Sequence, residues 1–221
     1  MTEANNVPED PHQAQTVRLA GAPLDRAKCA MLMVHGRGAR AEDILTLADQ
    51  LNQPDFAYLA PQAAGQTWYP NRFLVPIAEN EPWLASALSF VERVFVEIND
   101  AGIPSERIIL LGFSQGACLT LEYAARNARR YGGIVGLSGA LIGPDGTPRN
   151  YEGSLMRTPV FLGCSDVDFH VPKERVDEAA DVLRRLGGEV TERLYAGLDH
   201  TVNQDEIDFV RGMMQAVLSG I

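Results

Sequence analysis

The sequence has few cysteines, no long hydrophobic run and no secretion signal at its N-terminus. Its three cysteines cannot all pair within the chain, so we expect reduced thiols, as in a cytoplasmic protein. No apolar run approaches the roughly 18 residues that span a bilayer, and the first residues lack the basic and apolar regions of a signal peptide. We therefore expect a cytoplasmic protein without stable membrane association.

Basic residues are also scarce. The 221 residues include 19 Lys and Arg against 29 Asp and Glu, a net charge of −10. Nucleic-acid affinity comes largely from basic side chains that neutralise phosphates, and no basic run is present to supply it. The same deficit disfavours binding to an anionic membrane surface. These counts exclude a nucleic-acid partner but say nothing about the fold.

What is present is an alternation of short apolar runs with longer amphipathic ones, in a chain that is 46% hydrophobic. We expect a flexible tail over residues 1–14, because it is polar and contains Pro8 and Pro11, followed by one domain over 15–221. Strands are predicted over 29–34, 56–60, 107–113, 134–137, 159–163 and 189–195, and helices over 41–53, 81–101, 117–130, 173–186 and 204–218. This order predicts an α/β fold with a mostly parallel central sheet and helices on both faces. The connection over 139–158 is too short for a large lid domain.

The segment G-F-S-Q-G over residues 112–116 fits the G-x-S-x-G pattern. In a nucleophile elbow the serine lies on a strained turn between a strand and a helix, and flanking glycines relieve the crowding. A predicted strand precedes Ser114 and a predicted helix follows it. The alternative is a β–α turn with an incidental serine, so Ser114 is a candidate nucleophile.

A serine nucleophile needs a base, and the base needs an acid to orient it. In hydrolases that use a nucleophile elbow, the three residues occur along the chain in the order serine, acid, histidine, and each lies on a loop after a strand. His200 follows the last predicted strand, whereas His170 lies only two residues beyond Asp168. Asp166 and Asp168 both follow the strand over 159–163, and their spacing does not choose between them. The alternatives are a surface-loop histidine and an aspartate that caps its own loop.

Acyl transfer also needs hydrogen-bond donors for the developing oxyanion. The backbone N–H of Gln115, at the start of a helix, is one candidate. The backbone N–H of Arg37, in the segment H-G-R-G over 35–38, is the other. The alternative for this segment is a glycine-rich turn that enters the next helix.

Four segments together resemble the phospholipase/carboxylesterase family of α/β hydrolases, which includes acyl-protein thioesterases and small bacterial carboxylesterases. They are H-G-x-G over 35–38, G-F-S-Q-G-A over 112–117, D-x-x-V-P over 168–172 and G-x-x-H over 197–200. The resemblance covers nearly the whole chain beyond the tail and implies an α/β-hydrolase fold. It also implies that Asp168 is the catalytic acid, that His200 is the base and that Arg37 supplies an oxyanion N–H. Thioesterase relatives typically carry H-G-L-G-D, where this chain has Arg37 and Ala39.

The substrate pocket is expected to be shallow and uncovered. The connection over 62–80 is rich in large apolar residues, and we expect it to line an acyl pocket. The candidate lining residues on this connection are Trp68, Tyr69, Phe73, Leu74, Val75 and Ile77, with Leu141, Ile142 and Phe169 from later loops. The alternative is that these residues pin a long loop to the core.

These features predict a serine carboxylesterase that hydrolyses short- to medium-chain carboxylic esters through an acyl-enzyme. No metal or organic cofactor is expected, because no ligand cluster has suitable spacing. The predicted partner is a small-molecule ester, and a homodimer is possible. The alternatives are an acyl-protein thioesterase, a lysophospholipase and, from another class, a non-catalytic binding protein with a hydrolase fold.

Overall fold

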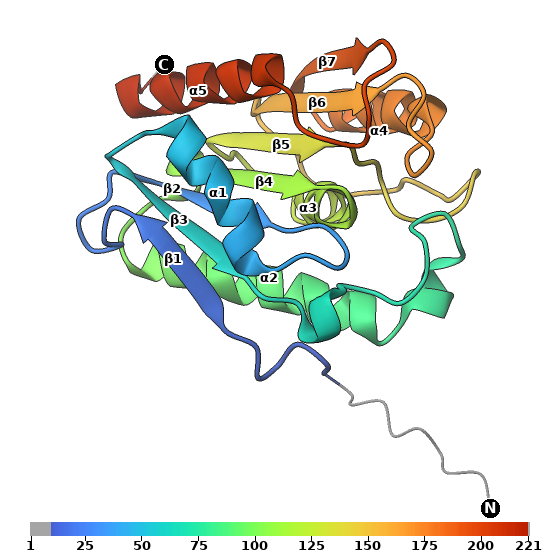
Figure 1. The fold of residues 1–221 in the computed structure, drawn as a ribbon, viewed down its shortest axis with the longest axis horizontal. Helices are drawn as coiled ribbons and strands as arrows, with labels where there is room; N and C mark the ends of the chain where they lie inside the picture. The colour runs from blue at the N-terminus through green and yellow to red at the C-terminus, as the bar shows by residue number, and fades with distance from the viewer. Residues whose placement is uncertain (1–9, 221) are drawn as a thin grey trace, which may run out of the picture.

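The computed structural model describes residues 10–220, which are built around one seven-stranded sheet (Figure 1). Its strands are β1 (Val17–Gly21), β2 (Cys29–Val34), β3 (Phe56–Pro61), β4 (Ile108–Phe113), β5 (Gly133–Leu137), β6 (Pro159–Ser165) and β7 (Glu189–Tyr195). They lie in the order β1-β3-β2-β4-β5-β6-β7, and every neighbouring pair is parallel except β1 with β3. The predicted α/β fold with a mostly parallel sheet is confirmed.

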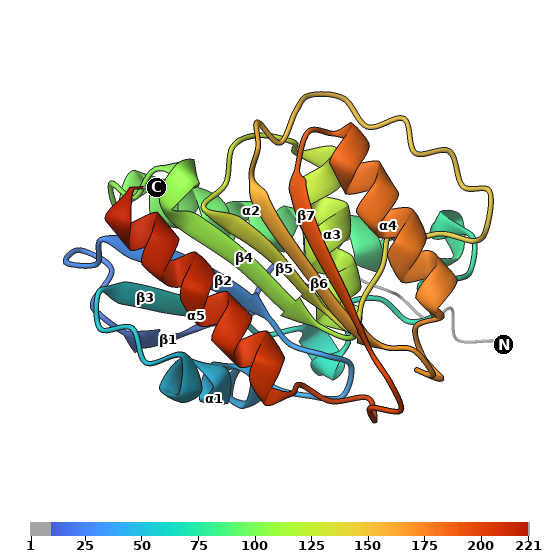
Figure 2. The same ribbon diagram turned by 90° about the horizontal axis from the view of Figure 1, so that it is seen from above.

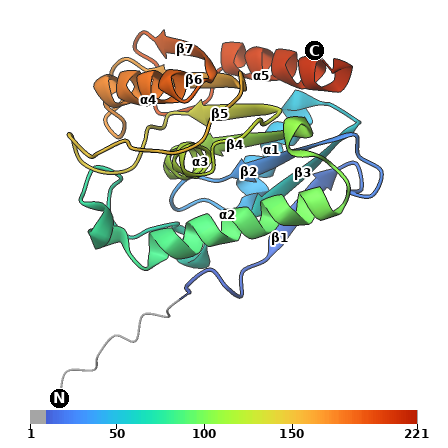
Figure 3. The ribbon, with the colours of Figure 1, turned by 180° about the vertical axis from the view of Figure 1, so that it is seen from behind.

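Helices cover both faces of this sheet. They are α1 (Ala41–Leu51), α2 (Trp83–Asp100), α3 (Gln115–Arg126), α4 (Lys173–Arg185) and α5 (Gln204–Ser219). Helices α1 and α5 pack on one face, and α2, α3 and α4 pack on the other (Figures 2 and 3). Because the central strands are covered on both sides, all six residues of β2 and five of the six in β4 are buried. Such strands read as continuous apolar runs, which is why the sequence revealed them.

Strand β1 was not predicted. It pairs antiparallel with β3, from Val17 opposite Pro61 to Gly21 opposite Ala57, at the edge of the sheet. None of its five residues is buried. The strand therefore lacks the apolar run that identifies its neighbours.

Residues 10–14 correct the predicted extent of the tail, whose other residues, 1–9, lie outside the described part of the chain. Residues 10–14 form a turn, and His12 within it is completely buried. The His12 ring accepts a hydrogen bond from the Ala64 N–H at Nδ1 (3.1 Å) and donates from Nε2 to the Trp68 carbonyl (3.0 Å). Burial lowers the pKa of His12, which favours this neutral form. Residues 10–14 thus pack onto the domain.

The sheet brings the candidate functional residues to one edge. Ser114 follows β4, Asp168 follows β6, His200 follows β7 and Arg37 follows β2. Because the carboxyl ends of parallel strands share an edge, these loops meet there. The connection over 138–158 contains no helix, and no helix of residues 10–220 is long and apolar enough to cross a membrane.

Candidate active site

Ser114 lies on a strained turn between β4 and α3. Its backbone has φ 55° and ψ −122°, a conformation that L-residues rarely adopt. The two flanking glycines permit the turn. A Cβ on Gly116 would lie 2.1 Å from the Val34 carbonyl oxygen, and one on Gly112 would lie 2.3 Å from the Gly116 carbonyl oxygen. The Ser114 N–H donates to the Leu137 carbonyl (2.9 Å), which ties the turn to β5.

His200 connects Ser114 to Asp168. Its Nδ1 lies 2.6 Å from Asp168 Oδ2, and its Nε2 lies 2.8 Å from Ser114 Oγ. An ionised carboxylate only accepts hydrogen bonds, so Nδ1 is the donor. In the neutral imidazole Nε2 is then free to accept the Ser114 hydroxyl proton. The rings of Phe113 and His170 lie beside His200, with centroids 5.1 Å and 4.9 Å away.

Asp168 has a completely buried side chain whose two oxygens are both occupied. Oδ1 accepts hydrogen bonds from the N–H groups of His170 (2.7 Å) and Val171 (3.1 Å), while Oδ2 faces His200. Burial pushes the pKa of Asp168 upward, but the hydrogen bonds from His200 and the two amides outweigh it and hold the pKa below its usual value. Asp168 is therefore ionised at neutral pH.

Asp166 does not contact His200 and instead binds the loop that carries it. It is exposed, and its Oδ1 accepts a hydrogen bond from the Gly197 N–H (2.9 Å). It thus braces the loop that carries His200 without touching the ring. The spacing left Asp166 and Asp168 open, and the structure places only Asp168 against His200.

One candidate oxyanion donor, Arg37, lies on the loop after β2, and the other, Gln115, lies at the start of α3. Gln115 is the first residue of α3, so its N–H has no acceptor within the helix. Its side chain is occupied, because Nε2 donates to the Tyr69 carbonyl (2.8 Å) and Oε1 accepts from the Trp68 N–H (3.0 Å). The Arg37 guanidinium binds the same loop, donating to the carbonyls of Tyr69 (2.9 Å) and Pro70 (2.8 Å). Both side chains hold the loop over 67–71 in place, which leaves the backbone amides as the candidate donors.

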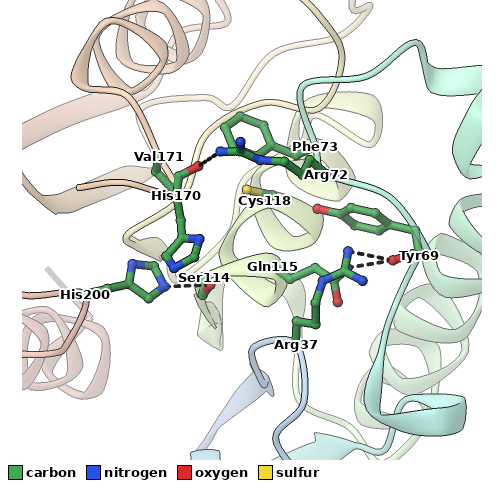
Figure 4. Close-up of a pocket in the computed structure, with 10 residues that line it drawn as sticks. All are labelled: Arg37, Tyr69, Arg72, Phe73, Ser114, Gln115, Cys118, His170, Val171 and His200. Carbon is green, nitrogen blue, oxygen red and sulfur yellow. Dashed lines mark hydrogen bonds between the residues drawn. The ribbon is translucent and has the colours of Figure 1, made fainter.

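A cavity of about 260 Å³ opens beside Ser114 (Figure 4). We call it the Ser114 pocket. Its lining residues are Arg37, Tyr69, Arg72, Phe73, Ser114, Gln115, Cys118, His170, Val171 and His200. Three of them come from the connection over 62–80, so this connection does form a wall. Within residues 10–220, no group of three or more His, Cys, Asp or Glu side chains is placed to hold a metal ion.

Most of the predicted pocket residues lie elsewhere. Of the candidates, Tyr69 and Phe73 line the pocket, whereas Val75 and Ile77 do not. Trp68 is fully buried and donates from Nε1 to the His35 carbonyl (2.8 Å), so it pins the loop to the core.

The remaining candidates do not line the Ser114 pocket either, for different reasons. Leu141 and Ile142 are completely buried in the core. Leu74 borders a separate hollow, which includes Arg175. Phe169 is 94% exposed and does not line the pocket. An apolar residue type does not reveal which way a loop side chain points.

The sequence analysis did not name Arg72, Cys118 or Val171 as lining residues. Cys118 follows Ser114 by four residues, and residues at this spacing share a helix face, so its position beside Ser114 could have been predicted. Arg72 lies on a loop, where no periodic pattern in the sequence predicts which way a side chain points.

The chain is similar to known proteins over nearly all of its length. The family model described as Phospholipase/Carboxylesterase matches residues 20–218. A crystal structure of a phospholipase/carboxylesterase from Dyadobacter fermentans is 44% identical, with a TM-score of 0.88, and the match covers 91% of this chain and 97% of that one. The Bacillus cereus carboxylesterase is 17% identical with a TM-score of 0.71, covering 97% and 100% of the two chains, and this likeness shows the fold alone.

Acyl-protein thioesterases are also similar. Acyl-protein thioesterase 1 of Yarrowia lipolytica is 26% identical over 208 residues, which are 84% of this chain and 90% of that protein. The protein of the same name from Gibberella zeae is 33% identical over 125 residues. That match covers 54% of this chain and spans only about half of the relative, 52% of its length.

Proposed function

Because the chain belongs to the phospholipase/carboxylesterase family of α/β hydrolases, we propose that it is a serine carboxylesterase for short- to medium-chain esters. The observation that carries the proposal is the line of contacts from Ser114 Oγ to His200 Nε2 (2.8 Å) and from His200 Nδ1 to Asp168 Oδ2 (2.6 Å). This geometry suits a nucleophile, its base and the acid that orients the base.

In the first step Ser114 Oγ attacks the ester carbonyl carbon while His200 Nε2 takes the hydroxyl proton. The carbonyl oxygen becomes an oxyanion, which the N–H groups of Arg37 and Gln115 stabilise. Asp168 stabilises the imidazolium electrostatically and keeps its Nδ1 hydrogen-bonded. The intermediate collapses, the alkoxide leaves with the proton from His200, and Ser114 retains the acyl group.

In the second step water attacks the acyl-enzyme, and His200 again removes the proton. Collapse of the second intermediate returns the proton to Ser114 Oγ and releases the carboxylic acid. The strained backbone of Ser114 supports this sequence, because it holds Oγ between His200 and the start of α3.

The size of the Ser114 pocket, about 260 Å³, supports a short or medium acyl chain. We expect kcat/KM for p-nitrophenyl esters to stop rising beyond about eight acyl carbons, because longer chains extend into water and bury no further surface. Rates that rise steadily from acetyl to palmitoyl esters would contradict this assignment.

The test of the reaction itself is Ser114→Ala. We expect this variant to lose at least about 10⁴-fold in kcat for p-nitrophenyl butyrate, since the nucleophile is gone while binding remains. Circular dichroism and the thermal midpoint give the control for folding. A folded Ser114→Ala variant with wild-type turnover would overturn the proposal, and a wild type without hydrolysis would favour a non-catalytic binding protein.

A second candidate is hydrolysis of acyl thioesters on proteins. It is favoured by the similarity to the thioesterase of Yarrowia lipolytica, which covers 90% of that protein. Comparing an S-acylated peptide with a short oxyester of equal acyl length separates the two. A lysophospholipase activity is tested in the same panel with a lysophospholipid.

A further inference from the structure

The Ser114 pocket is lined by basic groups although the chain as a whole is acidic. Two of its lining side chains, Arg37 and Arg72, carry a positive charge, two more are the imidazoles of His170 and His200, and no lining residue is an Asp or Glu. This contrasts with a net charge of −10 for the full sequence. Charge of one sign gathered around a concave site raises the local concentration of ligands of the opposite sign. The pocket therefore favours an anion.

The two guanidinium groups are available to different degrees. Arg37 donates to the backbone carbonyls of Tyr69, Pro70 and Asn71 at distances of 2.5–2.9 Å, so it is committed to the loop. Arg72 is exposed, and its Nη2 lies 3.4 Å and 3.3 Å from the carbonyls of Phe169 and His170, which are long contacts. A carboxylate can replace such contacts with charge-assisted ones, which are roughly twice as strong as neutral hydrogen bonds. Arg72 is the cation that a ligand can reach.

A buried hydroxyl faces the same cavity. Tyr69 is 1% exposed, and within residues 10–220 its hydroxyl has no hydrogen-bond partner of ordinary geometry. The Cys118 thiol, a weak partner, lies beside it, and the ring is directed toward the middle of the pocket (Figure 4). Leaving a buried hydroxyl unpaired is unfavourable, and an alkyl chain in the pocket would leave it so. An oxygen of the substrate would accept its hydrogen bond.

Three hydrogen bonds fix the backbone of Tyr69. Its carbonyl accepts hydrogen bonds from Arg37, from Gln115 Nε2 and from Thr67 Oγ1 (3.0 Å). The hydroxyl is thus positioned before any substrate arrives, which lowers the entropy cost of using it. A separate hollow borders His200, Phe113 and Val202, and we assign it to the alcohol part of the ester, which His200 protonates as it leaves. The Tyr69 side of the site is then free for the acyl group.

We propose that the acyl group of the substrate carries a carboxylate, which accepts a hydrogen bond from the Tyr69 hydroxyl and is attracted by the Arg72 guanidinium. The substrate class is the monoester of a short dicarboxylic acid. This inference rests on the proposed esterase activity and names the acyl group on which that activity acts. The cavity of about 260 Å³ accommodates such a group.

The test compares two esters of nearly equal shape, monomethyl succinate and methyl 4-methylpentanoate, in which two methyl groups replace the carboxylate oxygens. Hydrolysis is followed by titration of the released acid, and each kcat/KM is divided by the rate of hydroxide hydrolysis of the same ester. We expect the wild type to prefer the succinate monoester by about tenfold or more, the value of one charge-assisted hydrogen bond. Equal corrected values, or a preference for the neutral ester, would overturn the inference.

Three variants assign the preference to its residues. In Arg72→Gln and in Tyr69→Phe the ratio of the two kcat/KM values should fall toward one, whereas Arg72→Lys should keep most of it because the charge remains. Arg26→Gln removes the same charge at an exposed position in the β1–β2 connection, outside the Ser114 pocket. Its ratio should stay at the wild-type value. If Arg26→Gln and Arg72→Gln lower the ratio equally, net charge rather than the pocket is responsible and the inference is wrong.

The two proposals fail in different ways. A Ser114→Ala variant that still hydrolyses both esters would overturn the esterase mechanism. Loss of hydrolysis in Ser114→Ala together with a wild-type ratio near one would overturn only the carboxylate preference.

Discussion

Asp166 and Asp168 lie two residues apart on one loop, yet only one of them touches the imidazole. Asp168 Oδ2 lies 2.6 Å from His200 Nδ1, while Asp166 Oδ1 binds the Gly197 N–H. Under the proposed mechanism Asp168 serves catalysis, whereas Asp166 only supports the loop. The same substitution, Asp to Asn, can therefore be made at each residue and its effects on activity compared.

Asp168→Asn should lower kcat for a short ester by about 10³- to 10⁴-fold, because the amide no longer stabilises the imidazolium and permits the wrong tautomer. Asp166→Asn keeps an oxygen for the Gly197 N–H and should change kcat by less than about tenfold. Steady-state kinetics with p-nitrophenyl butyrate provide the measurement. If both variants lose activity equally, the role assigned to Asp168 is wrong.

Glu206 is a second buried carboxyl, on α5 behind β6. Its Oε2 accepts a hydrogen bond from the Asn203 N–H (2.8 Å), while within the described residues its Oε1 has no partner. Burial raises the pKa of Glu206 to about 7, partly offset by the Asn203 hydrogen bond and increased by the charge of Asp205. The folded protein therefore binds a proton more tightly than the unfolded chain does.

The consequence is a pH-dependent stability. As pH rises from about 4.5 to about 7, the unfolded chain loses this proton first, so the free energy of unfolding falls, by an amount on the order of 3 kcal/mol. Glu206→Gln removes the titrating group, and its stability should decline less over that range. Urea unfolding at a series of pH values provides the measurement.

The control for this experiment is Asp208→Asn, at an exposed position of the same helix, whose stability should follow the wild-type curve. A Glu206→Gln curve parallel to the wild type would contradict the prediction.

The spacing in the sequence pointed to Ser114 and His200 but left Asp166 and Asp168 open, and only the family resemblance singled out Asp168. Most of the pocket wall was missed. All three polar residues follow predicted strands, and the carboxyl ends of parallel strands share an edge, so their meeting at that edge was predictable. Trp68 and Phe169 point in opposite directions, into the core and into solvent. Their direction depends on loop contacts distant in sequence, such as the bond from His12 to the Trp68 carbonyl.

At the scale of elements, the turn between β4 and α3 depends on how closely α3 approaches β2. The absence of a Cβ on Gly116 permits this approach, since a Cβ there would lie 2.1 Å from the Val34 carbonyl oxygen. Another glycine, Gly212, lies within α5, and apart from the adjoining backbone of that helix no atom of the described residues lies within 4 Å of the place where a Cβ would be. The two glycines therefore have opposite effects on stability when substituted.

Gly116→Ala should destabilise the fold by about 2 kcal/mol or more, because α3 must move away from β2. Gly212→Ala should stabilise it by about 0.5–1 kcal/mol, since alanine favours the helix and meets no neighbour. Denaturant unfolding of both variants checks the pair. A neutral Gly116→Ala variant with full esterase activity would refute the close approach as the reason for this glycine.

The elements themselves were predicted to within a few residues, with two informative exceptions. Helix α3 runs from Gln115 to Arg126 rather than over 117–130, so it ends four residues early, and it starts early because the elbow places Ser114 directly at its N-terminus. Strand β1 was missed, whereas β7 at the opposite edge was predicted at its observed bounds although it too has no buried residue. Lack of burial alone therefore does not hide a strand. The start of β7 is marked in the sequence by the Gly187-Gly188 pair that precedes it, and β1 has no such signal before it.

At the scale of the whole molecule, the connection between β5 and β6 contains no helix, so nothing of domain size covers the Ser114 pocket in residues 10–220. An open site needs no lipid surface to expose it. We expect the rate with a sparingly soluble neutral ester such as tributyrin to follow a simple hyperbola through its solubility limit. A sharp rise in rate at that limit would indicate a cover that opens at an interface.

The net charge of the whole molecule is negative, whereas the charged side chains that line the Ser114 pocket are the arginines 37 and 72. The acidic side chains lie outside the lining of the Ser114 pocket, where the arginines and histidines gather. Composition alone gave the net charge of −10, but only the fold reveals that the site is basic. The overall charge disfavours polyanionic partners and is still compatible with a small anionic substrate.

The most direct test of the central claim is covalent labelling of the folded protein with a fluorophosphonate. Its phosphorus accepts the Ser114 oxygen, fluoride leaves, and His200 takes the hydroxyl proton. Peptide mapping by mass spectrometry should find one adduct, on Ser114, with hydrolysis lost in proportion to labelling and no adduct in Ser114→Ala. An unlabelled wild type, or an inactivating adduct on another residue, would contradict the account.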